Sequence, residues 1–87
     1  MLQHIRLDPD LCEDLRRDLN AGGWLITHQD VGQTELVGYG YVIRWEKNGR
    51  KVILNYADRQ GAAEANLEIS QEALAEIQAL IARLPAE

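Results

Sequence analysis

The chain has 87 residues, with 14 Asp or Glu against 9 Lys or Arg, and a net charge of -5. This length predicts a single domain over residues 1–87 with a thin core, and the charge disfavours binding to nucleic acid or an anionic membrane. One cysteine excludes an internal disulfide. Since neither a signal peptide nor an apolar run of about 20 residues is apparent, we expect a soluble cytoplasmic protein without membrane contact.

The first part of the chain predicts one helix. Leu2 to Leu7 is short and mixed, and fits either an edge strand or an irregular lead-in. Asp8 is a good helix N-cap and Pro9 suits the first helical position, so a helix should follow and end near Asn20, before two glycines. Its buried stripe should be Leu11, Leu15 and Leu19, with Cys12 at the margin.

Residues 24–29 predict the first strand of a meander. Asp30 to Gln33 then reads as a turn, of type II if Gly32 takes the third position. That turn predicts the pairs Ile26 with Val37 and Trp24 with Tyr39.

A hairpin from Leu36 to Tyr56 is the strongest local signal. Two apolar runs flank Asn48 and Gly49, a pair that favours a two-residue type I′ turn because both central residues need positive φ. The expected pairs are Trp45 with Val52, Ile43 with Leu54, Tyr41 with Tyr56, and Glu46 with Lys51. A three-residue loop with a glycine bulge would invert one strand and place Lys51 opposite Trp45, so we adopt the two-residue turn.

This register gives the sheet two different faces. One carries all of the aromatic residues, and the other carries Leu36, Val42, Arg44, Ile53 and Asn55 together with glycines. Both faces contain enough apolar residues to be partly covered. The sequence leaves open whether two helices share one face or divide between them.

The last third of the chain predicts a strand and a helix. Ala63, Ala65, Leu67 and Ile69 alternate with polar residues, as in a half-buried strand. Ser70 should cap a helix that contains Leu74, Ile77, Ile81 and Leu84 and ends at Pro85. The fold class is therefore α+β: an antiparallel β-meander of four strands, or five with Leu2 to Leu7, with one N-terminal and one C-terminal helix.

Aromatic residues on one face form the main candidate interaction surface: Trp24, Tyr39, Tyr41, Trp45 and Tyr56. Such rings usually form a core or a dimer interface, and on an open sheet they can also stack single-stranded bases. Basic residues near the hairpin tip could then contact phosphates: Arg44, Lys47, Arg50 and Lys51.

No catalytic set is apparent. His28, Asp30 and Glu35 should meet near the first hairpin loop, but residues of this kind at a polar turn are usually solvated, so we expect no metal site and no cofactor. Cys12 lies among acidic residues, which raise a thiol pKa and disfavour a nucleophile.

The segment from Leu67 to Leu74, a strand that runs into a serine-capped helix, is similar to the end of the whirly-type single-stranded DNA-binding transcription cofactors. In that family a four-stranded meander precedes a dimerising helix. The resemblance covers this short stretch alone, and the acidic balance and the N-terminal helix depart from the family pattern. It implies single-stranded nucleic-acid binding as the alternative function.

Two functional hypotheses follow. The first is a non-enzymatic protein-interaction module, regulatory or adaptor in character, that acts as a homodimer or with another protein. It rests on the thin core, the surplus of apolar sheet surface and the lack of a catalytic set. The second is a single-stranded nucleic-acid binder that uses the aromatic face and the basic hairpin tip.

Overall fold

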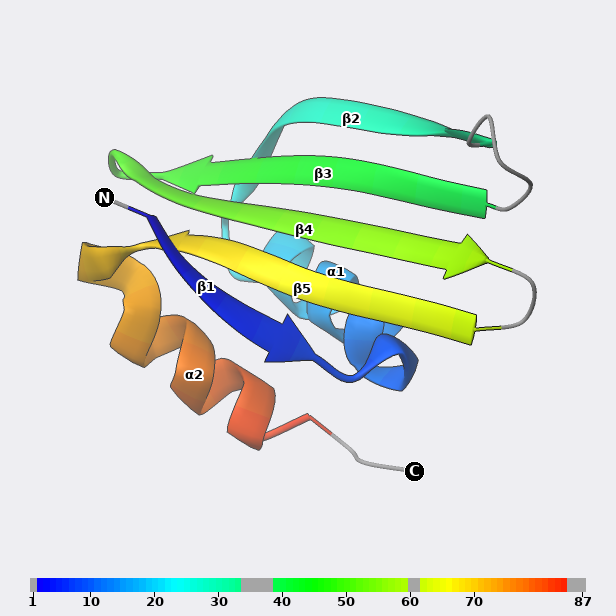
Figure 1. Ribbon diagram of the computed structural model, residues 1–87. Helices are drawn as coiled ribbons and strands as arrows, with labels where there is room; N and C mark the ends of the chain where they lie inside the picture. Colours follow the sequence, from blue (N-terminus) through cyan, green and yellow to red (C-terminus); the bar gives the residue numbers. More distant parts are fainter. Residues whose placement is uncertain (1, 34–38, 60–61, 85–87) are drawn as a thin grey trace.

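The computed structural model describes residues 2–33, 39–59 and 62–84, which form a five-stranded antiparallel sheet and two helices (Figure 1). The elements are β1 (Leu2–Leu7), α1 (Cys12–Ala21), β2 (Leu25–Gln33), β3 (Tyr39–Lys47), β4 (Arg50–Arg59), β5 (Ala62–Ser70) and α2 (Leu74–Ala82). The α+β class is confirmed, and the segment from Leu2 to Leu7 is the fifth strand.

The strands lie in the order β1-β5-β4-β3-β2. Strands β2 to β5 form the predicted meander, and β1 pairs antiparallel with β5 at the far side. The chain leaves β1, passes through α1, and enters the sheet again at the opposite edge with β2 (Figure 1). β1 and β2 are therefore the two edge strands.

The central hairpin has the predicted turn and register. Asn48 and Gly49 have φ of 53° and 79°, as a type I′ turn requires. The observed pairs include Trp45 with Val52, Ile43 with Leu54, Tyr41 with Tyr56, and Glu46 with Lys51. The glycine-bulge alternative is thereby excluded.

The predicted turn between the first two strands is wrong. β2 continues through Gln33, which pairs with Tyr39, and Gly32 pairs with Gly40 inside the ladder. Ile26 lies opposite Trp45 rather than Val37, which falls outside the described residues, and Trp24 precedes the strand. Gly32 does not have the positive φ of a type II turn, so the strand passes through it.

The start and end of α1 follow from local hydrogen bonds. The Asp8 side chain accepts a hydrogen bond from the Asp10 N–H at 3.0 Å, at the start of a 3₁₀ turn over Pro9–Leu11 that leads into the helix. At the other end, Gly23 has φ of 89° and the Trp24 N–H donates to the Leu19 carbonyl at 3.1 Å. This is a Schellman ending, which a glycine favours.

The start of α2 differs from the prediction. Ser70 directly precedes a 3₁₀ turn over Gln71–Ala73, but its hydroxyl does not cap it. Instead, the hydroxyl accepts a hydrogen bond from the Lys51 N–H at 3.0 Å. Ser70 therefore extends the contact between β5 and β4, and the α-helix begins four positions later, at Leu74.

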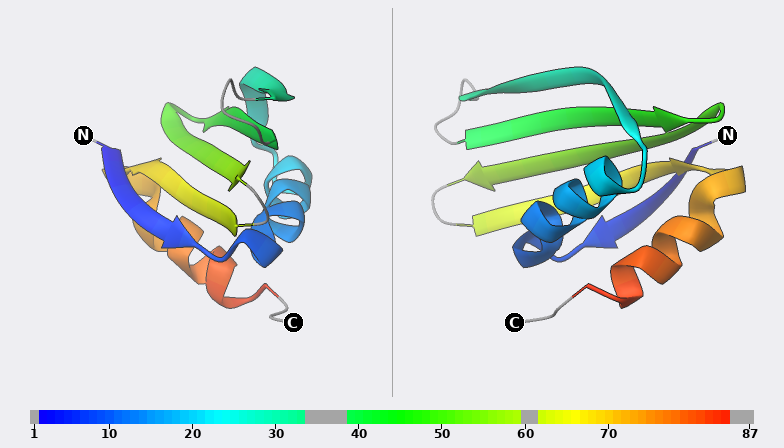
Figure 2. Two further views of the ribbon diagram at one scale, coloured as in Figure 1. Left: turned by 45° about the vertical axis from the view of Figure 1, so that its right-hand side comes forward. Right: turned by 180° about the vertical axis from the view of Figure 1, so that it is seen from behind.

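Both helices cover the same face of the sheet, and neither lies on the other (Figure 2). Helix α1 contributes Leu15, Leu19 and also Cys12, which is 2% exposed and thus belongs to the core rather than its margin. Helix α2 contributes Ile77. The sheet contributes mainly Tyr41, Ile43, Trp45, Val52, Leu54, Ala65, Leu67 and Ile69. The helices thus leave the second face of the sheet open. Neither described helix is long and apolar enough to cross a membrane.

The turn geometry gives a test of the fold. We expect Gly49→Ala to lower the free energy of unfolding by about 1–2 kcal/mol, because a residue with a side chain is strained at positive φ. An added Cβ at Gly49 would meet no atom within 4 Å, so the loss would report backbone strain alone. Urea denaturation measures the change.

Gly32→Ala is the matched control, since Gly32 also has open space for a Cβ and lacks the positive φ. It should change stability by less than about 0.5 kcal/mol. Equal effects of the two substitutions would contradict the turn geometry.

Candidate interaction surface

The predicted aromatic interaction face is the core of the folded chain. Trp24, Tyr41 and Trp45 are 3%, 6% and 0% exposed. The Trp45 Nε1 donates a hydrogen bond to the Asn20 Oδ1 at 3.0 Å, which satisfies the only polar atom of that ring. The chain's own helices therefore cover these rings, and a partner or a nucleotide base would have to displace a helix to reach them.

The two remaining aromatic candidates are placed differently. Tyr56 is half-buried and its ring stacks on Tyr41, with ring centroids 4.9 Å apart and planes 19° from parallel. Tyr39 is the first residue of β3, where its backbone pairs with Gln33 and Asp58. The predicted face is thus assembled in the sheet, but largely as interior surface.

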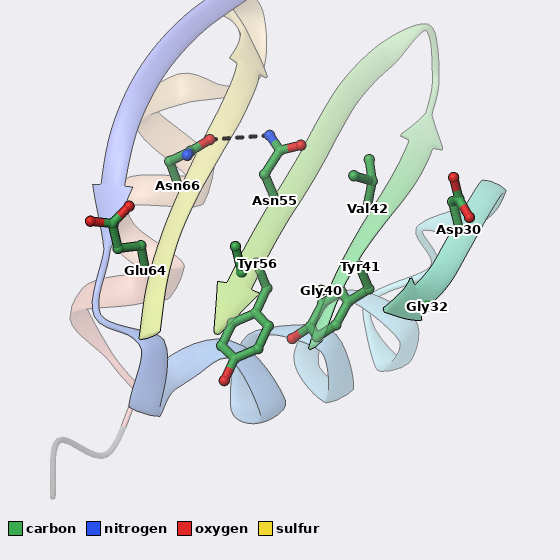
Figure 3. Close-up of a pocket in the computed structure, with 10 residues that line it drawn as sticks. Asp30, Gly32, Gly40, Tyr41, Val42, Asn55, Tyr56, Glu64 and Asn66 are labelled. Carbon is green, nitrogen blue, oxygen red and sulfur yellow. Dashed lines mark hydrogen bonds between the residues drawn. The ribbon is translucent and has the colours of Figure 1, made fainter. Parts of the chain in front are cut away.

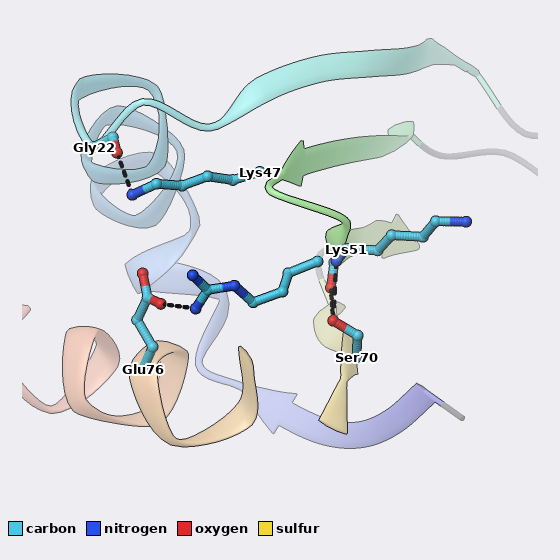
Figure 4. A network of polar contacts seen from close by, with 6 residues as sticks. Gly22, Lys47, Lys51, Ser70 and Glu76 are labelled. Carbon is cyan, nitrogen blue, oxygen red and sulfur yellow. Dashed lines mark hydrogen bonds and ion pairs between the residues drawn. The ribbon is translucent and has the colours of Figure 1, made fainter. Parts of the chain in front are cut away.

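Two of the four basic candidates hold the hairpin tip to the helices (Figure 4). The Lys47 Nζ donates to the Gly22 carbonyl at 2.8 Å, and it lies 5.9 Å from the centre of the Trp24 ring. Arg50 forms an ion pair with Glu76 on α2, at 2.6 Å. Both cations are therefore engaged within the fold.

The other two basic candidates, Arg44 and Lys51, are exposed and project from the open face. That face carries one row of side chains across all the strands, formed by His28, Arg44, Ile53, Glu68 and His4. His4 and Glu68 lie 3.5 Å apart in this row. The open face is therefore mixed in charge and does not present a basic stripe.

A shallow hollow of about 370 Å³ lies at the other end of the open face (Figure 3). Gly32 and Gly40 leave its floor without side chains, and the Asn55 Nδ2 donates to the Asn66 Oδ1 at 3.1 Å across it. Asp30 and Glu64 are its charged lining residues. The hollow therefore offers hydrogen-bond acceptors, and its described lining residues include no histidine, cysteine or serine.

The buried titratable groups lie on the helix side of the sheet. Burial raises the pKa of the Cys12 thiol, as Glu13 nearby also does, although a hydrogen bond with Tyr41 opposes the shift. Burial also raises the pKa of the Tyr41 hydroxyl, and Arg16 lies 5.0 Å over the Tyr41 ring. A thiol that stays protonated is a poor nucleophile, as the acidic neighbours of Cys12 predicted.

Candidate metal ligands do not assemble in the described part of the chain, where no group of three His, Cys, Asp or Glu side chains could hold an ion. His28 and Asp30 lie two residues apart on β2, while Glu35 falls outside the described residues. The set of His28, Asp30 and Glu35 considered as a metal site is therefore described only in part, by His28 and Asp30.

Strand β2 is the surface that the sequence did not reveal. The large hydrophobic side chains that are exposed within the described residues all lie on it: Leu25 is 71% exposed, Ile26 44% and Val31 46%. The sequence pattern placed Val31 in a turn and Ile26 on the aromatic face. It therefore did not predict that these apolar side chains would be exposed together on one strand. The β-branched Val31 just before Gly32 was the one signal for a longer strand.

The two edge strands differ in this respect. On β1, the exposed side chains are His4 and Arg6, and the buried Leu7 points to the helices. Charged residues on an edge discourage pairing with other chains, whereas a long edge with exposed apolar residues invites it. β2 is therefore the best candidate interaction surface in the described chain.

Comparison with protein-family models, with curated proteins and with solved structures finds no match to this chain.

The buried thiol gives a second test. We expect Cys12 in the native protein to react with a thiol reagent at least about tenfold more slowly than an exposed cysteine, because its pKa is raised and its side chain is covered. The matched variant is Ala79→Cys, which adds an exposed thiol on α2. Mass spectrometry of the labelled chain measures both rates.

The raised pKa of Cys12 also makes the free energy of unfolding depend on pH. A pKa that folding raises stabilises the native state below the ordinary thiol pKa, and the stabilisation disappears as pH rises through the folded value. The free energy of unfolding should thus fall in mildly alkaline solution, and less so in Cys12→Ala. Labelling of Cys12 as fast as the added thiol would contradict this account.

Proposed function

We propose that this protein is a non-enzymatic interaction module, regulatory or adaptor in character, that acts as a homodimer in the cytoplasm. The observation that carries the proposal is the concentration of exposed large apolar side chains on one edge strand, β2. Elsewhere in the described chain such residues are covered. A strand edge of this kind provides both unpaired main-chain groups and apolar area, which together favour strand-to-strand association.

The size of the chain supports the same proposal. A domain of this length buries a limited fraction of its unfolded surface, so association adds burial that the monomer lacks. The polar features fit a binding role as well. The hairpin-tip cations Lys47 and Arg50 bond within the fold, and the thiol of Cys12 is covered. These groups hold the scaffold together rather than face a substrate.

The proposal predicts a dimer in solution. Light scattering or sedimentation at micromolar concentration should give twice the mass of the chain. Val31→Lys should weaken the dimer by roughly tenfold or more, because it places a charge within apolar contact area. Val31 is 46% exposed in the monomer, so the substitution should leave folding intact.

Gln78→Lys on the exposed side of α2 adds the same charge and should leave the dimer unchanged. A protein that remains monomeric in these measurements and binds no protein partner would contradict the proposal. A dimer that Val31→Lys and Gln78→Lys weaken equally would leave β2 out of the interface.

The alternative, single-stranded nucleic-acid binding, draws its remaining support from the exposed Arg44 and Lys51. Stacking would need exposed rings, whereas Tyr41 and Trp45 are covered by the helices. We therefore expect labelled single-stranded oligonucleotides to show no change in fluorescence anisotropy in low salt. Binding that is lost in Arg44→Glu with Lys51→Glu would favour the alternative instead.

A further inference from the structure

The free edge of β2 has only part of the usual protection of a sheet edge. The strand has nine residues, contains neither lysine nor proline, and none of the described strands pairs with its outer side. Of the features by which natural edge strands avoid pairing with other chains, it has a bulge near its start and one carboxylate, Asp30, and it lacks lysine, proline and short length. β1 has six residues and carries Arg6. The two edges of the same sheet are therefore not equivalent.

We infer that β2 pairs antiparallel with β2 of a second copy, around a two-fold axis that is perpendicular to the sheet and passes midway between the two Gln29 residues. This inference rests on the proposed homodimer and specifies its interface. One continuous sheet would then run through both copies, with all helices on the same side. Neither helix extends over β2, so the helix layers leave this edge accessible (Figure 2).

The faces of β2 follow from its pairing with β3. Gln29 and Val31 pair with the buried Ile43 and Tyr41, so both lie on the helix side. His28 and Asp30 pair with Arg44 and Val42 and lie on the open side. A two-fold axis perpendicular to the sheet keeps each face on its own side, so only residues of the same face meet.

Polar and charge complementarity select the register. With Gln29 opposite Gln29 of the second copy, His28 lies opposite the second copy's Asp30, and the same pair recurs on the other side of the axis. The Asp30 carboxylate would accept a hydrogen bond from the facing imidazole N–H, and complementary polar pairs on directly facing residues stabilise a pair of antiparallel strands. Within the described residues, neither side chain has an ion-pair partner in the monomer. Arg44 next to His28 adds positive charge on the same side.

Apolar contact supports the same register. The irregularity between Ile26 and His28 inserts Thr27 into the strand, so that Ile26, opposite Trp45, shares the helix side with Gln29. Two positions from the axis, Val31 of one copy then lies beside this bulge and Ile26 of the other. Both side chains are nearly half exposed in the monomer, at 46% and 44%. Because of the two-fold symmetry, this contact between Val31 and Ile26 would occur twice in the dimer.

Neighbouring symmetric registers are less favourable. An axis at Asp30 would place two carboxylates opposite each other, and like charges in this position destabilise strand pairing. An axis at His28 would place the two His28 side chains opposite each other and leave Asp30 without a facing His28. Of these three registers, only the one centred on Gln29 pairs a carboxylate with an imidazole and also brings apolar residues together.

Disulfide trapping in the full chain reads the register directly. Gln29→Cys should form an intermolecular disulfide under mild oxidation, because facing residues of antiparallel strands have Cα atoms within disulfide range. Gln3→Cys is the matched control, since Gln3 lies on β1, the opposite edge, and also on the helix side. Cys12 is retained in every variant because it is 2% exposed.

We expect Gln29→Cys to crosslink on the order of a hundredfold faster than Gln3→Cys, given the effective concentration within a dimer. His28→Cys or Asp30→Cys crosslinking as fast as Gln29→Cys would overturn the register. Equal rates for Gln29→Cys and Gln3→Cys would overturn pairing through β2. If light scattering still gives a dimer in that case, the proposed function stands and this interface fails; a monomer would end both.

Exchanging the charges at positions 28 and 30 tests the same register independently. His28→Asp alone places two carboxylates opposite each other across the axis, and Asp30→Lys alone removes the carboxylate that faces His28, so each variant should sediment as a monomer. An equimolar mixture faces aspartate with lysine and histidine with aspartate, and should give a mixed dimer. Native mass spectrometry distinguishes it from the two homodimers. Failure of the mixture to associate, with both variants folded, would overturn the proposed charge pairing.

Discussion

The register of the hairpin between β3 and β4 is the constraint on which the rest of the structure depends. Side chains alternate between the faces of a strand, so a slip of one residue at Asn48 and Gly49 would move Trp45 and Ile43 from the helix side to the open side. With the two-residue turn, Val52 and Leu54 join them, and all four are 0% exposed. The helices can then pack on one apolar surface, and the opposite face is left polar enough to remain uncovered.

The sequence predicted those features that depend on neighbouring residues. Asn48 and Gly49 fix a turn by their own φ preferences, and the alternation around Leu67 fixes a half-buried strand. Gly32 fits either a turn or a strand. It lies in a strand because it pairs with Gly40 on β3, a contact that the residues next to Gly32 do not reveal. Ser70 is similar: its hydroxyl could cap a helix, but Lys51 on the adjacent strand offers a competing N–H.

The candidate site could be predicted only in part, because the sequence cannot tell which face two helices choose. Val42 and Ile53 give the open face some apolar character, so both faces were reasonable targets for Leu15 and Ile77. Once both helices lie on the aromatic side, the rings become interior, and the exposed apolar area moves to the strand that neither helix reaches. The exposure of Ile26 and Val31 is thus a consequence of helix placement rather than of local sequence.

The difference between the two edges also bears on how large an assembly could become. Pairing of β2 with β2 of another copy uses the same surface twice and closes on itself, whereas pairing of β2 with β1 would repeat without end. Arg6 and His4 make β1 a poor acceptor for an apolar strand. If β2 pairs with β2 as proposed, the assembly stops at two copies, because both β2 edges are then used and β1 lies at each end of the joint sheet.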